Sequence, residues 1–176
     1  MSAFVINPYA FTKNLVVNGD FSDVTGLTQN INNWWGRGIP AGWSAAAPTA
    51  NTNDFVVRLK DGRYYANLGT LTREPDAGLI LFTQNIPALV TGGTVQLTFF
   101  ASNPFNGNAW ALGFVIINAS TGTWLANSST FNTPASQTLN LSLQASVGAG
   151  VPLRIGFWRG AGSQTPAITD ISLKIV

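Results

Sequence analysis

Alternating apolar and polar positions dominate this chain, and no window shows the three- and four-residue apolar spacing of a capped amphipathic helix. In residues 94–102, for example, Val95, Leu97 and Phe99 fall on one face of an extended strand. Gly, Pro, Asn and Asp, which are typical of turns, separate most of the alternating stretches. The pattern predicts strands over residues 55–60, 63–68, 79–86, 94–102, 110–118, 122–126, 138–143, 153–159 and 168–176.

The length and the number of strands define the expected fold class. A chain of 176 residues has the size of one domain and can build one core. About nine or ten short strands without covering helices require two antiparallel sheets packed on each other. We therefore expect an all-β fold, an antiparallel β-sandwich of the jelly-roll kind. Residues 1–13 are interpreted as an N-terminal extension, residues 14–176 as a single domain, and residues 24–48 as a long loop region.

The alternation also assigns side chains to the two faces of a strand. In residues 110–118, Leu112, Phe114 and Ile116 are expected to face the core, whereas Ala111, Gly113 and Val115 face outward. Because Ala111 and Gly113 are small, we expect room for a groove on that face.

Charge is scarce and changes the set of expected partners. Only 9% of the residues are charged, and nine basic residues, scattered from Lys13 to Lys174, are offset by seven acids. A nucleic-acid-binding protein normally gathers its basic residues on one face, so we expect no nucleic-acid partner. No apolar run of about twenty residues is present, so we expect no membrane insertion, and the opening residues lack the pattern of a classical signal peptide.

The chain has neither histidine nor cysteine, which excludes disulfides, thiol nucleophiles and the common catalytic triads. Glycoside hydrolysis needs two carboxyl groups facing the substrate, one of them with a raised pKa. The seven available acids lie mostly in predicted turns, and they are Asp20, Asp23, Asp54, Asp61, Glu74, Asp76 and Asp170. We therefore expect that the protein is not an enzyme. An unusual carboxylate pair would require two of these acids within about 10 Å of each other across a cleft.

Several short motifs, in order along the chain, resemble one known group of domains. Residues 14–21 have the sequence Asn-Leu-Val-Val-Asn-Gly-Asp-Phe and are followed by Gly-Trp-Ser at 42–44. Together with residues 81–87, 92–101 and 168–173, they resemble galactose-binding-like β-sandwich domains, especially carbohydrate-binding modules of the family 4, 9 and 22 type. The resemblance implies a jelly roll with a non-catalytic sugar-binding role. It also implies a buried Trp43, and Trp110 is expected in the core because it shares the parity of Leu112.

Aromatic side chains are the main candidates for a ligand platform, because a flat ring matches the C–H face of a pyranose. The neighbouring Trp34 and Trp35 lie in a predicted loop where both cannot easily be buried. Trp158 alternates with Ile155 and Phe157, so it either lies in the groove on the outer face or packs under a loop.

Two adjacent tyrosines, Tyr64 and Tyr65, must point to opposite faces of their strand, so one is expected in the core and the other at the surface. The alternation does not select between them. Arg58 and Gln84 are candidate hydrogen-bonding neighbours of the exposed ring.

A structural calcium ion is a further expectation, because the resembling modules often hold one between the first and the last strand. Asp170 corresponds to the acid of their closing strand, and Asp20 lies in the turn after the first apolar run. The alternative is that both carboxylates cap turns or accept backbone hydrogen bonds.

Two hypotheses on function follow. The first is a non-catalytic carbohydrate-binding module or lectin-like protein that recognises a poly- or oligosaccharide, for example a cell-surface glycan, through exposed aromatic and amide side chains. The alternative is a structural or assembly protein of a virion or fibre, such as a phage decoration or tail-associated protein, whose aromatics make contacts between subunits of a homo-oligomer or virion. Both hypotheses imply an extracellular or virion-associated location.

Overall fold

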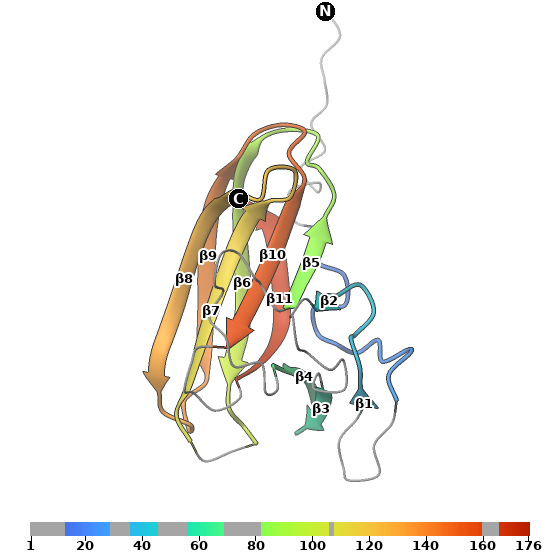
Figure 1. Cartoon of the computed structure of the whole chain (residues 1–176), viewed down its shortest axis with the longest axis vertical. Helices are drawn as coiled ribbons and strands as arrows, with labels where there is room; N and C mark the ends of the chain where they lie inside the picture. The colour runs from blue at the N-terminus through green and yellow to red at the C-terminus, as the bar shows by residue number, and fades with distance from the viewer. Residues whose placement is uncertain (1–12, 29–35, 46–55, 69–81, 106–107, 160–165) are drawn as a thin grey trace, which may run out of the picture.

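The computed structural model describes residues 13–28, 36–45, 56–68, 82–105, 108–159 and 166–176. Strands in these ranges form two antiparallel sheets that pack face to face, and the described part contains no helix (Figure 1). It therefore also contains no helix long and apolar enough to cross a bilayer. The expected all-β sandwich is confirmed.

Each sheet combines strands from distant parts of the sequence. The six-stranded sheet has the order β1 (Gly36–Arg37), β3 (Val56–Lys60), β4 (Arg63–Asn67), β11 (Ala167–Ile175), β6 (Gly93–Ser102) and β9 (Leu139–Val147). The five-stranded sheet has the order β2 (Ser44–Ala45), β5 (Phe82–Ile86), β10 (Leu153–Arg159), β7 (Trp110–Asn118) and β8 (Trp124–Thr133). The last strand thus lies between β4 and β6, in the interior of its sheet.

The core lies between the sheets and is centred on aromatic contacts. The ring of Phe99 on β6 meets the rings of Phe114 on β7 and Phe157 on β10 edge to face, each with a centroid distance of 4.9 Å. The residues that the alternation assigned to the core are at most 2% exposed, which confirms the assignment: Val95, Leu97, Phe99, Leu112, Phe114 and Ile116.

The opening segment closes one side of this core. Trp43 stacks on Phe82 with a centroid distance of 4.5 Å, and its indole N–H donates a hydrogen bond to the carbonyl oxygen of Asn18 at 3.2 Å. Its exposed fraction is 6%, and that of Trp110 is 0%, so both tryptophans are core residues as expected. The backbone N–H of Leu15 donates to Leu173 at 2.9 Å, which holds the opening segment beside β11.

Two strands are longer than the pattern predicts. Strand β8 runs to Thr133, although the prediction stopped at residue 126, because an edge strand with exposed Asn127, Ser128 and Ser129 carries no apolar alternation. Strand β9 runs to Val147, and its buried Ala145 and Val147 continue the inward face beyond the predicted end at residue 143. The two-residue strands β1 and β2 were not predicted, and residues 1–12 and 79–81 lie outside the described ranges.

The expected groove over Ala111 and Gly113 is wrong, because the indole of Trp158 occupies this space. A Cβ atom on Gly113 would collide with that indole. Trp158 is 8% exposed, and its ring lies beside that of Trp124 with a centroid distance of 5.6 Å. The small outward residue thus accommodates a side chain of the same sheet rather than a ligand. Ala111 and Val115, which alternate with the core residues of β7, are also buried, at 6% and 0% exposed.

We expect the substitution Gly113→Ala to lower the free energy of unfolding by about 1–3 kcal/mol, because the new methyl group must displace the Trp158 indole. Urea denaturation measures this change. Gly148→Ala is the matched control, because a Cβ there meets Val151 at an ordinary 3.5 Å. Equal stability of the two variants would contradict the packing described here.

Candidate functional site

The β3–β4 hairpin carries three cationic side chains and one tyrosine on its outer face. Arg58 is paired in register with Tyr65, and Lys60 with Arg63, so these four residues share one face of the hairpin. Val57 and Ala66, which alternate with them, are 1% and 2% exposed in the core and define that face as the outer one. The hairpin forms locally because its Asp-Gly turn at 61–62 has φ angles of 52° and 74°.

Phe105 lies on this outer face. It follows β6 through Asn103 and Pro104 and reaches the hairpin, where the guanidinium carbon of Arg58 lies 4.6 Å from the centroid of its ring. The ring of Tyr65 meets it edge-on with a centroid distance of 6.0 Å, and Lys60 Nζ lies 5.9 Å from its centroid. Lys60 Nζ also donates a hydrogen bond to the carbonyl of Pro104. We call Arg58, Lys60, Arg63, Tyr65 and Phe105 the hairpin patch.

The electrostatics of the hairpin patch are positive. Arg63 lies 3.6 Å from the carboxylate of Asp170, with side chains 50% and 35% exposed, and its guanidinium carbon is 5.5 Å from the ring centroid of Phe100. Such a solvent-exposed ion pair contributes about 0–1 kcal/mol. Burial lowers the pKa of Arg58 to about 10, so its guanidinium is still cationic at neutral pH. Three cationic side chains and the carboxylate of Asp170 thus lie on this face of the sheet.

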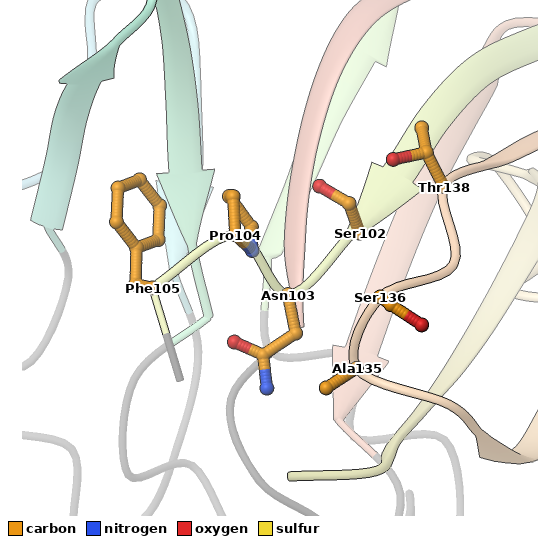
Figure 2. A pocket seen from close by; sticks show the side chains of 7 residues that line it. All are labelled: Ser102, Asn103, Pro104, Phe105, Ala135, Ser136 and Thr138. Carbon is orange, nitrogen blue, oxygen red and sulfur yellow. The ribbon is translucent and has the colours of Figure 1, made fainter. Parts of the chain in front are cut away.

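A pocket of about 710 Å³ adjoins the hairpin patch and shares Phe105 with it. Figure 2 shows Pro104 and Phe105 on one side of this pocket and the side chains of Ser136 and Thr138 on the other. The amide nitrogen of Asn103 donates to the carbonyl of Asn108 at 3.0 Å, which fixes the segment that carries Phe105. The full lining consists of Ser102, Asn103, Pro104, Phe105, Ala135, Ser136 and Thr138.

The structure brings some of the predicted ligand residues together. Arg58 and Tyr65 are neighbours in the hairpin patch, and Tyr65 is the tyrosine that faces outward. Tyr64 points to the other face, where it packs against the hydrophobic core. Trp34 and Trp35 lie outside the described residues.

Gln84 and Trp158 lie elsewhere. Gln84 is on β5 in the other sheet and 3% exposed, and its amide makes two hydrogen bonds to the backbone of Val17, accepting from the N–H at 2.7 Å and donating to the carbonyl at 2.8 Å. From the sequence, we expected Gln84 to be a hydrogen-bonding neighbour of the exposed tyrosine. The structure places it on the other sheet, so this expectation is wrong. Trp158, on the outer face of the five-stranded sheet, packs over Gly113 as described above.

The two expected calcium ligands each have another partner. Asp20 accepts hydrogen bonds from the N–H and hydroxyl of Ser22, at 3.2 and 3.0 Å, whereas Asp170 pairs with the cationic Arg63. The carbonyl of Gly19 accepts a hydrogen bond from the N–H of Ile171, so the segments that carry Asp20 and Asp170 are neighbours. Among the described residues, no group of three or more His, Cys, Asp or Glu side chains gathers at one place. Calcium binding stays a prediction.

The sequence analysis missed Phe105, Lys60 and Arg63 as site residues. Phe105 stands in a turn-rich stretch after Asn103 and Pro104, and a large aromatic residue in such a stretch was the available signal. For the two cations the available signal was the Asp-Gly turn at 61–62, because a two-residue hairpin turn pairs Lys60 with Arg63 on the face of Arg58.

We compared the sequence and the fold of the chain with those of known proteins. No family model matches the chain, and no curated protein matches it in sequence. Solved structures do match it in fold. A candidate sugar-binding protein from Bacteroides thetaiotaomicron superimposes with a TM-score of 0.63 at 11% identity, over 93% of this chain and 100% of that one.

Two carbohydrate-binding modules also superimpose on this chain. A family 61 module, solved in complex with β-1,4-galactotriose, has a TM-score of 0.60 at 12% identity over 93% of this chain and 99% of its own. A family 4 module has a TM-score of 0.55 at 19% identity over 91% and 99%. The chain has the fold of the jelly-roll carbohydrate-binding modules. In this jelly roll, the hairpin patch and its pocket lie on the outer face of the six-stranded sheet.

We expect Gln84→Leu to lower the free energy of unfolding by about 1–2 kcal/mol, because it removes both hydrogen bonds to Val17. Chemical denaturation measures the change. Its neighbour Asn85 accepts an exposed hydrogen bond from Arg154, and Asn85→Ala should change stability by less than about 0.5 kcal/mol. Equal stability of the two variants would contradict a structural role of Gln84.

Proposed function

We propose that this protein binds a poly- or oligosaccharide without cleaving it, through the hairpin patch and the adjoining pocket. The observation that carries the proposal is the position of Phe105. Its half-buried ring contacts Tyr65 and also lines a pocket with hydroxyl groups on the opposite side.

This combination suits the chemistry of a sugar. A pyranose has an apolar C–H face that stacks on an aromatic ring, and a rim of hydroxyl groups that needs hydrogen-bonding partners. Phe105 and Tyr65 supply the aromatic surface, whereas the exposed Ser136 and Thr138 supply hydroxyl groups. The volume of about 710 Å³ falls within the range of about 300–1,000 Å³ that is usual for small-ligand sites.

The fold comparisons support a sugar ligand in general terms. Proteins that share this jelly roll include a module solved with a bound galacto-oligosaccharide and a module named for xylan binding. At 11–19% identity, the likeness concerns the fold, and the ligand of this chain has to come from its own residues.

The described acids support binding rather than hydrolysis. Asp20 and Asp23 hold local turns, and hydrogen bonds from Thr25 lower the pKa of Asp23, whereas a general acid needs a raised pKa. Asp61 lies in the turn of the β3–β4 hairpin, and Asp170 pairs with Arg63. Asp54, Glu74 and Asp76 lie outside the described residues.

The alternative, a structural or assembly role in a virion or fibre, stays a prediction. Large hydrophobic residues at the described surface are few: Val17, Leu59, Val90 and Val176. A broad apolar patch would be the specific sign of an assembly interface.

We expect Phe105→Ala and Tyr65→Ala each to weaken glycan binding about tenfold, because each removes an aromatic surface worth about 1 kcal/mol or more. Isothermal titration calorimetry against a panel of plant and bacterial oligosaccharides measures the affinity. Tyr65→Phe keeps the ring and loses the hydroxyl, and should retain most of the affinity.

The outer face of the other sheet provides a second control. Trp124→Ala removes a larger ring beside Trp158, far from the hairpin patch in the sheet order, and should leave affinity unchanged. Full affinity in the Phe105→Ala and Tyr65→Ala proteins, or the absence of binding to every glycan, would contradict the proposal.

A further inference from the structure

We propose that the glycan is acidic, carrying carboxylate or sulfate groups that the cations of the hairpin patch recognise. This inference rests on the proposed sugar-binding function and adds the chemical class of the ligand. Three observations carry it: the local concentration of cations, the uncharged outer side chains of β6 and β9, and the contact of two of these cations with the aromatic ring of the pocket.

The cations are concentrated by the hairpin. The chain has nine basic residues in total, and three of them, Arg58, Lys60 and Arg63, lie on one face of two paired five-residue strands. In sequence the basic residues are dispersed, as the sequence analysis stated, but the Asp-Gly turn at 61–62 folds these three onto one surface. Asp170 lies 3.6 Å from Arg63.

Strands β6 and β9 carry uncharged side chains on the same outer face. Gln96 and Thr98 on β6 alternate with core residues, and each is paired in register with an uncharged residue of β9, Gln144 and Ser142 respectively. On the other side of β6, Gln96 is paired with Lys174 of β11, which adds one cation to this face. The uncharged positions suit sugar hydroxyl groups, whereas the cations of the hairpin suit an anion.

The cations and the pocket share one aromatic ring. Arg58 lies 4.6 Å and Lys60 Nζ 5.9 Å from the ring centroid of Phe105, which also lines the pocket. A sugar ring stacked at Phe105 therefore places its exocyclic group near these two charges. Arg58 is partly buried, so an anion beside it interacts through a medium of lower dielectric than water. A guanidinium also matches the planar fork of a carboxylate or the oxygens of a sulfate.

The test compares glycans that differ in charge on the same backbone. Polygalacturonate is compared with its fully methyl-esterified form, and dextran sulfate with dextran, so that carboxylate and sulfate are tested separately. We expect the full-length protein to bind at least one acidic polymer about tenfold or more tightly than its neutral counterpart. Binding should weaken about fivefold or more between 0.05 and 0.5 M NaCl, because salt screens exposed charges.

Single charge-removing variants locate the effect. Lys60→Gln and Arg63→Gln should each weaken binding of the acidic polymer about fivefold, whereas Arg154→Gln, on the other sheet, is the matched control and should not. Asp170→Asn removes the competing carboxylate and should tighten binding. Asn tolerates the positive φ of 52° at that position, so the backbone is preserved. Thermal melting confirms that each variant is folded.

The outcomes separate this inference from the proposed function. Equal affinity for charged and neutral glycans would overturn the acidic class and leave sugar binding in place. Binding to no glycan would overturn both. Equal affinity for oligothymidylate would show a general anion site rather than a glycan site, and unchanged affinity in Lys60→Gln and Arg63→Gln would remove the hairpin patch from the site.

Discussion

The packing of two inner faces against each other determines the rest of this structure. Phe99, Phe114 and Phe157 come from three strands and two sheets, and each buried phenylalanine contributes about 1.5–3 kcal/mol relative to an exposed one. Because side chains alternate along a strand, a shift of one residue would turn each of these rings into solvent. The register is therefore fixed by the core, and the register in turn decides which residues reach the outer faces. The candidate site is a consequence of this constraint.

The two outer faces use their residues differently. On the five-stranded sheet, Gly113 makes room for Trp158, so an indole that could have met a ligand covers its own sheet. On the six-stranded sheet, the segment after β6 carries Phe105 onto the β3–β4 hairpin, beside Arg58 and Tyr65. An aromatic ring, exposed hydroxyl groups at a pocket and three cationic side chains meet there. That face has the chemistry of a binding site, whereas the opposite face has the chemistry of additional core.

The sequence was sufficient to predict a strand wherever apolar and polar residues alternate regularly between turn residues. The predicted bounds of β7 and β10 agree with the structure, because each strand alternates regularly and is bounded by turn residues. The end of β8 was not predictable, because an edge strand is held by backbone pairing to β7 and needs no apolar face. In the site, alternation required one tyrosine to face outward but could not select Tyr65, since that choice depends on which sheet face is buried. The contact of Phe105 with Arg58 depends on long-range packing and has no local signal.

The central claim is that sugar binds at the hairpin patch. Chemical-shift mapping by NMR on the ¹⁵N-labelled protein, during titration with the tightest-binding glycan, tests it most directly. The account predicts the largest shift changes at the backbone amides of Tyr65, Phe105 and Ser136, and little change at the amides of Gly113 and Trp158. Changes confined to the Gly113 and Trp158 surface, or to the indole signals of Trp34 and Trp35, would contradict it.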